Sequence, residues 1–196
     1  MFIVFEGLDG SGSTTQAKLL AERLEKTGRA SLLTKEPTDG TPIGKMIREI
    51  LQHKWSASPE SLQLLFCADR AEHLRNIIVP ALTNKQMVIC DRYVLSTLAY
   101  GGMYVDIEWL HDLNKFFIQP DLTFLLQLEP SKCLERITGR GSDIELFETK
   151  EKMEKIWRNY HALSERYANI HPLDADRPVD QVAGEIWEVV SRQLHL

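Results

Sequence analysis

The chain has 196 residues, of which 43% are hydrophobic and 26% charged, and its net charge is −5. This length suits one globular domain with a sizeable core, and the acidic balance argues against binding to a nucleic-acid polymer. No apolar run is long enough for a membrane span, and the first residues lack the pattern of a signal peptide. Three widely separated cysteines without metal-site spacing are typical of reduced thiols, so we expect a cytoplasmic protein.

Short apolar runs alternate with amphipathic segments along the chain. The apolar runs predict strands at 2–6, 30–34, 87–90, 122–128 and 170–173. The amphipathic segments predict helices at 13–26, 43–51, 59–82, 107–117, 131–137, 146–168 and 179–194. This alternation indicates an α/β fold, with a five-stranded parallel sheet flanked by helices on both faces, in one domain over residues 1–196.

Acidic residues stand at several predicted strand ends. They are Glu6, Glu36, Asp91 and Glu129. Because the carboxyl ends of parallel strands meet at one edge of a sheet, and ligands bind beyond that edge, the sequence predicts a polar site there.

The segment from Gly7 to Thr14 leads directly from the first strand into a helix. A phosphate-binding loop reads glycine, four residues, glycine, lysine, then serine or threonine. Gly7, Gly12 and Thr14 match this pattern, whereas Ser13 replaces the lysine. Taken alone, the loop is as compatible with a plain strand-to-helix turn as with a phosphate site. The residues predicted to hold ATP phosphates are Gly7, Leu8, Asp9, Gly10, Ser11, Gly12, Ser13, Thr14 and Thr15.

Two residue pairs indicate further ligand contacts. Asp91 can hold Mg²⁺ at a strand end, and Arg92 can hold a phosphate through its forked donors. Phe66 and Arg70 lie four residues apart on one helical face and suit a nucleobase, since one stacks and the other donates to a carbonyl. Taken alone, the first pair is better explained by an ion pair at a strand end, and the second by a core phenylalanine with a surface arginine.

A third pair consists of two arginines, Arg136 and Arg140, and precedes the acidic residues Asp143 and Glu145. Arginines at this spacing share a helical face, and they lead into a charged segment with glycines. The pattern predicts a lid over about residues 136–150, whose arginines stabilise charge on a transferring phosphoryl group. The alternative interpretation is a solvated helix end.

These motifs occur in an order that matches a known family. The matching stretches are residues 5–16, 35–37, 40–44, 65–73, 91–93, Ser96, 99–100, 120–123, 134–136, 140–141 and 173–175. On these stretches the sequence resembles thymidylate kinases over nearly its whole length. The resemblance implies a P-loop kinase fold, with transfer of the ATP γ-phosphoryl group to dTMP in the presence of Mg²⁺, giving dTDP.

The resemblance also implies roles for individual residues. The dTMP-binding residues would be Asp9, Glu36, Pro37, Arg48, Phe66, Arg70, Arg92, Thr97 and Tyr100. Phe66 would stack on thymine, Arg70 would donate to its O4, and Tyr100 would exclude a 2′-hydroxyl. The residues acting in catalysis would be Asp9, Arg92, Arg136 and Arg140, and the metal would be held by Thr14 and Asp91. The family is usually a homodimer, so we expect one here.

The chain also departs from the family. Lys35 replaces an arginine, and Gly101 stands where a glutamine often follows the tyrosine. Ser13 is the most consequential departure, because the P-loop lysine supplies positive charge to the β- and γ-phosphates. Arg140, Arg136, Lys18 and Lys35 are candidates to replace that charge, and the lid position favours Arg140. The alternatives are a nucleotide-binding protein with little catalysis and a kinase for another monophosphate.

Overall fold

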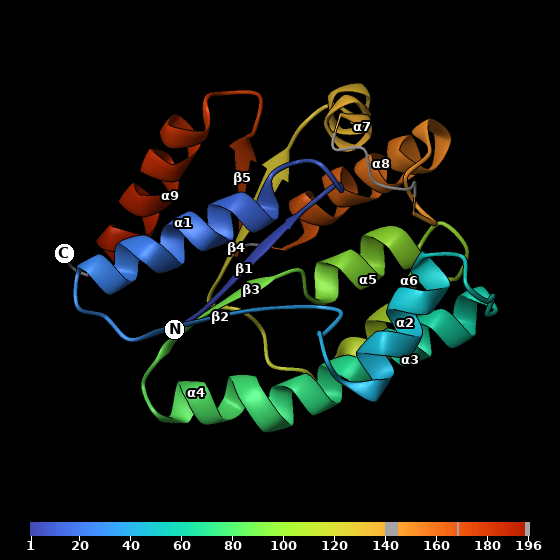
Figure 1. Cartoon of the computed structure of the whole chain (residues 1–196), viewed down its shortest axis with the longest axis horizontal. Coiled ribbons are helices and arrows are strands. Elements are labelled where there is room, and N and C mark those ends of the chain that lie inside the picture. The colour runs from blue at the N-terminus through green and yellow to red at the C-terminus, as the bar shows by residue number, and fades with distance from the viewer. Residues whose placement is uncertain (140–144, 168, 195–196) are drawn as a thin grey trace.

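The computed structural model describes residues 1–139, 145–167 and 169–194. At its centre lies a five-stranded sheet with the order β2-β3-β1-β4-β5, in which every neighbouring pair is parallel (Figure 1). The strands are β1 (Phe2–Gly7), β2 (Ser31–Lys35), β3 (Met87–Asp91), β4 (Leu122–Gln127) and β5 (Ile170–Asp174). The predicted α/β class and the parallel sheet are confirmed.

The helices surround this sheet. They are α1 (Ser13–Lys26), α2 (Pro42–Leu51), α3 (Pro59–His73), the π-helical segment η1 (Leu74–Ile78), α4 (Val79–Thr83), α5 (Val94–Gly101), α6 (Ile107–Asn114), α7 (Pro130–Thr138), α8 (Lys150–Arg166) and α9 (Val179–Gln193). Side-chain oxygens of Thr41 and Ser58 accept hydrogen bonds at the starts of α2 and α3, and a proline follows each. Both features favour a helix start at that residue.

Strand β1 shows how both faces of the sheet are buried. Because successive side chains of a strand point to opposite faces, Phe2 and Val4 pack in one cluster, with Ile78 of η1. Ile3 and Phe5 pack in the other cluster, with residues of α1 and α9. Figure 1 shows α1 and α9 on one side of the sheet and α4 on the other. A fully buried parallel strand of this kind reads as a continuous apolar run.

Several predicted helix boundaries were wrong. The predicted helix 59–82 consists of α3, η1 and α4 in succession; those predicted at 107–117 and 146–168 are shorter, with bounds Ile107–Asn114 and Lys150–Arg166. Helix α5 was not predicted at all. Most of its residues are buried, so it lacks the polar face that produces a helical period.

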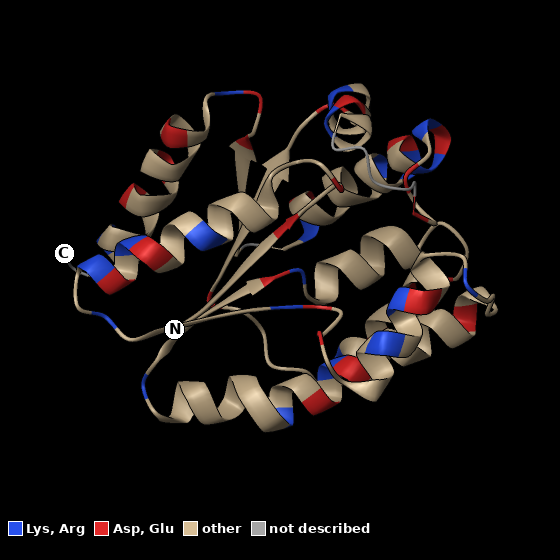
Figure 2. Cartoon of the chain, viewed as in Figure 1, with Lys and Arg blue, Asp and Glu red and all other residues tan. Residues whose placement is uncertain are grey.

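Charged residues of strands β1, β2 and β3 are concentrated near their carboxyl ends. Glu6 lies near the end of β1, Asp91 ends β3, and Lys35 ends β2. Figure 2 shows these coloured strand ends directed toward the same region, while the rest of each of these three strands is uncharged. The predicted polar edge of the sheet is therefore present.

Candidate active site

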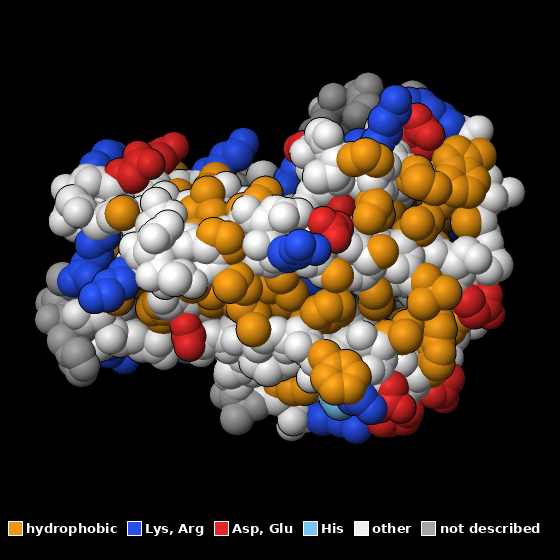
Figure 3. Space-filling model, turned by 90° about the horizontal axis from the view of Figure 1, so that it is seen from below, with side chains coloured by type: hydrophobic (Ala, Val, Ile, Leu, Met, Phe, Trp, Pro, Cys, Tyr) orange, Lys and Arg blue, Asp and Glu red, His pale blue; other side chains and the backbone are white. Residues whose placement is uncertain are grey.

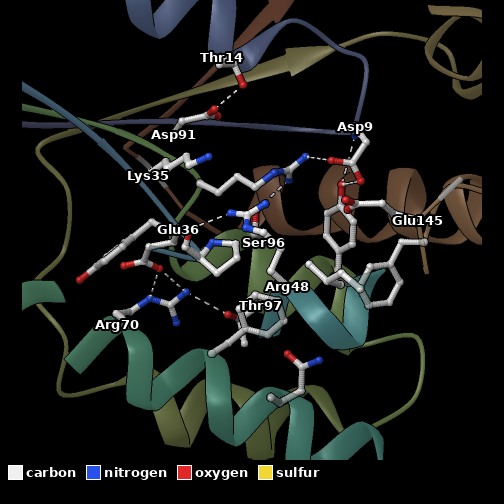
Figure 4. A pocket seen from close by; sticks show the side chains of 18 residues that line it. Asp9, Thr14, Lys35, Glu36, Arg48, Arg70, Asp91, Ser96, Thr97 and Glu145 are labelled. Atoms are coloured by element: carbon white, nitrogen blue, oxygen red, sulfur yellow. Dashed lines mark hydrogen bonds and ion pairs between the residues drawn. The ribbon is translucent and has the colours of Figure 1, made fainter. Parts of the chain in front are cut away.

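One cavity at the carboxyl edge of the sheet brings together the residues predicted to bind dTMP. Asp9, Glu36, Pro37, Arg48, Phe66, Arg70, Arg92, Thr97 and Tyr100 all line it (Figure 4). They come from the loop after β1, the segment after β2, helices α2, α3 and α5, and the segment after β3. Thr14 and Asp91, the predicted metal ligands, line the same cavity.

The phosphate-binding loop wraps the start of α1. Gly10 and Gly12 have φ values of 84° and 103°, in the left-handed region that favours glycine. A Cβ at Gly10 would lie 2.6 Å from the carbonyl oxygen of Cys133, so α7 packs directly on the loop. Ser13 begins α1 and is only 6% exposed. Backbone N–H groups at a helix start of this kind can bind phosphate.

A second cavity lies on the outer side of this loop. Gly10, Ser11, Gly12 and Thr15 line it together with Arg136 of α7. The Arg136 guanidinium donates to the carbonyl oxygens of Gly10 and Ser11 at 3.4 Å, and to that of Ala175 at 3.3 Å. Arg136 thus lies on the loop, as its assignment to the ATP side requires. Arg140, its predicted partner in the lid, lies outside the described residues.

The oxygen atoms of Thr14 and Asp91 fit a magnesium ion. The Thr14 hydroxyl donates a hydrogen bond to Asp91 Oδ2. Asp91 Oδ1 is buried and has no hydrogen-bond partner among the residues that the structure describes. Carboxylate and hydroxyl oxygens are ligands that Mg²⁺ prefers, and an unpaired buried carboxylate oxygen is costly without a cation.

Arg92 occupies the centre of the cavity in an unusual backbone conformation. Its φ is 73°, which is left-handed and rare for a residue other than glycine. Its Nη2 donates to Asp9 Oδ1 at 2.5 Å, and its Nη1 donates to the carbonyl oxygen of Gly7 at 2.9 Å. The Tyr100 hydroxyl donates to the other Asp9 oxygen at 3.1 Å. The arginine and the tyrosine together fix the Asp9 carboxylate between the phosphate loop and the acceptor cavity.

A buried ion pair fixes Arg70 at the other end of the cavity. Arg70 is 1% exposed, and its Nε donates to Glu36 Oε2 at 2.9 Å. Its Nη1 donates to Asn114 and its Nη2 to Thr97 Oγ1, the latter at 3.1 Å. His73 Nδ1 lies 3.1 Å from the other Glu36 oxygen. Nη2 also lies 2.8 Å from Glu36 Oε2, so both of its hydrogens have acceptors, whereas Nη1 keeps one hydrogen for a ligand atom.

Below Arg92, a buried carboxylate organises the start of α5. Glu6 is inaccessible to solvent, and its oxygens accept hydrogen bonds from the backbone N–H groups of Tyr93 and Ser96 at 2.9 and 3.2 Å. The hydroxyls of Ser96 and Tyr160 also donate to it, at 2.5 and 2.9 Å. Ser96 in turn accepts from Arg92 Nη1 at 3.1 Å. Glu6 therefore supports Arg92 indirectly, through Ser96.

We expect Glu6→Ala to lower the free energy of unfolding by about 3 kcal/mol, because buried donors would lose their acceptor. Urea denaturation at pH 7 measures the change. Glu6→Gln is the matched control, since it keeps the size of the side chain and one acceptor oxygen. A loss below 1 kcal/mol for the alanine variant would contradict this role.

Glu6 also makes the stability of the fold depend on pH, in a direction that can be predicted. Burial raises the pKa of Glu6 above its ordinary value, although Ser96 and Arg92 oppose the shift. The folded state therefore holds this proton more tightly than the unfolded state. Stability due to protonated Glu6 is complete below the ordinary pKa and is lost as pH rises through the folded pKa. Relative to Glu6→Gln, the native chain should thus lose stability over that range.

The segment just before α8, which is the described end of the predicted lid, contributes two residues to the lining of the cavity. Glu145 and Phe147 line the cavity, and the Phe147 ring packs edge-on against Tyr100, with 5.2 Å between ring centroids. Burial raises the pKa of Glu145, and Glu148 and Asp9 add to the shift. Sequence reasoning noted Glu145 only as an acidic residue of the lid. It also missed Ser96 and Gln63 as cavity residues, since neither belongs to a local pattern that indicates a ligand.

The three cysteines are free, and no helix in the described parts of the chain is both long and apolar enough to cross a membrane. Lys18 is exposed on α1 and lines a neighbouring cavity with Thr14, Asp91 and Lys35. Lys35 lines both this neighbouring cavity and the central one.

The chain is similar to known proteins over nearly its whole length. The family model described as thymidylate kinase matches residues 5–186. A probable thymidylate kinase of Pyrococcus horikoshii is 43% identical over 199 residues, covering 98% of this chain and 97% of the relative. One from Thermococcus onnurineus is 41% identical, covering 99% and 98%. A thymidylate kinase of Synechococcus sp. (strain JA-3-3Ab) is 41% identical, covering 99% and 97%.

Proposed function

Because the chain belongs to the thymidylate kinase family, we propose that it transfers the γ-phosphoryl group of ATP to the 5′-phosphate of dTMP, giving dTDP. The observation that carries the proposal is the central cavity, which is lined both by the residues predicted for the acceptor nucleotide and by the metal-ligand pair. Two independent sequence motifs, the phosphate loop and the Phe66/Arg70 pair, meet in this one space.

The acceptor binds along the cavity between Arg70 and Arg92. Phe66 offers a ring face to the thymine, and Arg70 offers its remaining Nη1 hydrogen to the thymine O4. Arg92 holds the acceptor phosphate as a forked donor, and Arg48 adds positive charge nearby. Tyr100 is anchored to Asp9 and limits the space beside the sugar.

The donor phosphates bind on the N–H groups of the loop and the start of α1. Thr14 and Asp91 would hold Mg²⁺, which neutralises the phosphate oxygens as charge moves in the transfer. Arg136, which already contacts the loop, contributes positive charge on the outer side. The chain's own contribution is thus positioning and electrostatic stabilisation of the two phosphate groups.

In a working kinase, the charge that Ser13 lacks comes from another cation. Arg140, which the sequence favours, lies outside the described residues. Among the described lysines and arginines, only Lys35 shares both cavities with Thr14 and Asp91. Lys35 is paired in register with Asp91, and Figure 4 shows it extending from the end of β2 into the central cavity. We assign this charge to Lys35.

The direct test is the conversion of nucleoside monophosphates with ATP. With Mg²⁺, the purified chain should form dTDP from dTMP faster than it phosphorylates dCMP or AMP, and chelation of the metal should abolish the reaction. Absence of dTDP at high protein concentration would overturn the proposal. Calorimetric binding of ATP and dTMP without turnover would instead support the second candidate, a binding protein disabled by Ser13.

We also propose a homodimer formed through helices α2 and α3. Met46 of α2 and Leu64 of α3 are 41% and 49% exposed, and Ile77 of η1 and Val79 of α4 are 38% and 43% exposed. Figure 3, which views the molecule from this side, shows apolar side chains spread between charged groups. Light scattering should give twice the chain mass, and Leu64→Glu should shift it toward the monomer. A monomeric native chain at micromolar concentration would contradict the interface.

A cytoplasmic location remains part of the proposal. Its support is the three free cysteines, which suit a reducing compartment.

A further inference from the structure

Gln63 has a buried oxygen without a partner in the central cavity. The residue is 2% exposed, and its Oε1 is buried and accepts no hydrogen bond from any residue that the structure describes. It nevertheless lines the cavity that holds Phe66 and Arg70. A buried polar atom without a partner destabilises a fold, so its retention points to a ligand atom that completes it.

The position of Gln63 on α3 matches that of the base-binding pair. Gln63, Phe66 and Arg70 follow the spacing i, i+3, i+7, which puts them on one face of the helix. The helix therefore presents an amide, an aromatic ring and a guanidinium in a single row along the cavity.

Gly101 provides the space that Gln63 fills. A Cβ added at residue 101 would lie 2.8 Å from both Cδ and Oε1 of Gln63. Any larger residue at 101 would therefore displace the amide. The glycine at position 101, where the family often has a glutamine, thus leaves room for the Gln63 amide with its unpaired oxygen.

The edge of thymine has a defined order of hydrogen-bonding groups. O4 is an acceptor, N3–H is a donor, and O2 is an acceptor. A donor that reaches O4 therefore needs an acceptor beside it for N3–H. Thr97 Oγ1 already accepts one hydrogen bond from Arg70, whereas Gln63 Oε1 accepts none from the described residues. Gln63 Oε1 is the cavity acceptor among the described residues that is both buried and unpaired next to this pair.

We propose that Gln63 is a specificity-determining residue whose side-chain oxygen accepts the N3–H of the acceptor base. This inference rests on the proposed function, since it names the group that reads the base in that same cavity. Cytosine has no hydrogen on N3, and it carries an amine in place of O4. Gln63 and Arg70 together thus select a base that offers an acceptor next to a donor.

The test pairs one protein variant with one altered nucleotide. N3-methyl-dTMP lacks the hydrogen that Gln63 would accept, and Gln63→Met removes the acceptor while keeping the length of the side chain. For the native chain, kcat/KM for dTMP should be on the order of 10²-fold higher than kcat/KM for N3-methyl-dTMP. In Gln63→Met, KM for dTMP should rise about tenfold, KM for ATP should not change, and the preference for dTMP should fall at least tenfold.

The outcomes separate this inference from the proposed function. If the native chain makes no dTDP, the proposed function fails. If it makes dTDP but uses both nucleotides equally, or if Gln63→Met keeps the full preference, only the role of Gln63 is overturned. Gln63→Asn keeps the amide but shortens it by one methylene, so it should behave as the methionine variant does. It serves as the second variant if Gln63→Met does not fold.

Discussion

Arg92→Ala lowers kcat/KM for dTMP by on the order of 10³, while KM for ATP changes less than threefold. The guanidinium is 18% exposed and is held at 2.5 Å from Asp9 and 2.9 Å from the carbonyl oxygen of Gly7. It is the arginine that we propose to hold the acceptor phosphate. Truncating one member of a desolvated, hydrogen-bonded charge pair typically loses about 2–5 kcal/mol of binding, and 10³ lies within that range.

Arg92→Lys is the matched control for this variant. Lysine keeps the charge and has the same difficulty as arginine at a φ of 73°, but it lacks the planar fork. We expect a loss between that of the alanine variant and the native value, because one donor direction replaces two. Steady-state kinetics with varied dTMP and fixed ATP measure both variants. If kcat/KM for dTMP falls less than tenfold in Arg92→Ala, Arg92 does not bind the acceptor phosphate.

Lys35→Met lowers kcat by on the order of 10² in the native chain, but by less than tenfold in a chain that carries Ser13→Lys. The first value follows from the loss of one preorganised charge at the transferring phosphoryl group. The second follows because a lysine restored to the loop would supply the same charge. Two residues with the same role lose activity non-additively, and a double-mutant cycle measures this coupling.

Lys35 is available for this role because its present ion pair, with Asp39, contributes little stability. Its Nζ lies 2.7 Å from Asp39 Oδ2, and the two side chains are 43% and 62% exposed. Exposed ion pairs contribute about 0–1 kcal/mol, so a polyphosphate competes readily for the ammonium group. Lys35→Arg keeps the charge and should retain most of the activity.

Equal losses from Lys35→Met in both backgrounds would contradict this assignment. The same cycle with Arg140→Ala then tests the residue favoured from the sequence. Coupling of Ser13 to Arg140, but not to Lys35, would place the replacement charge in the lid. Kcat at saturating ATP and dTMP is the quantity to compare, because it excludes differences in ground-state binding.

Local patterns in the sequence were sufficient for much of the site. The loop from Gly7 to Thr14 and the Phe66/Arg70 spacing depend only on neighbouring residues. Phe66, Arg70 and, from the loop, Asp9 and Thr14 line the central cavity, whereas Gly10, Ser11 and Gly12 line the second one. The strand ends converged because parallel strands share an edge, so Asp91 could be predicted to lie near the loop. The resemblance then supplied residues such as Thr97 and Tyr100, which no local pattern singles out.

The contacts that the sequence could not predict join residues far apart in the chain. Glu6 meets Tyr160 across 154 positions, and Glu36 meets His73 across 37. The sequence of helix α5 has no helical alternation of apolar and polar residues, because most of the helix is buried. The left-handed conformation of Arg92 is equally hidden, since nothing in its residue type favours it. Such features depend on packing of the whole domain.

Asp91 and Arg92 are consecutive in the chain, and this adjacency affects how the two substrates are placed relative to each other. Asp91 turns toward Thr14 on the donor side, and Arg92 turns toward Asp9 on the acceptor side. Their Cα atoms are about 3.8 Å apart across one rigid peptide unit. In the proposed reaction, the groups that hold the donor and the acceptor are therefore joined by a single covalent link at the end of β3, which fixes how the two reactants are aligned. Loop motions can then change how quickly nucleotides enter and leave without altering the geometry in which they react.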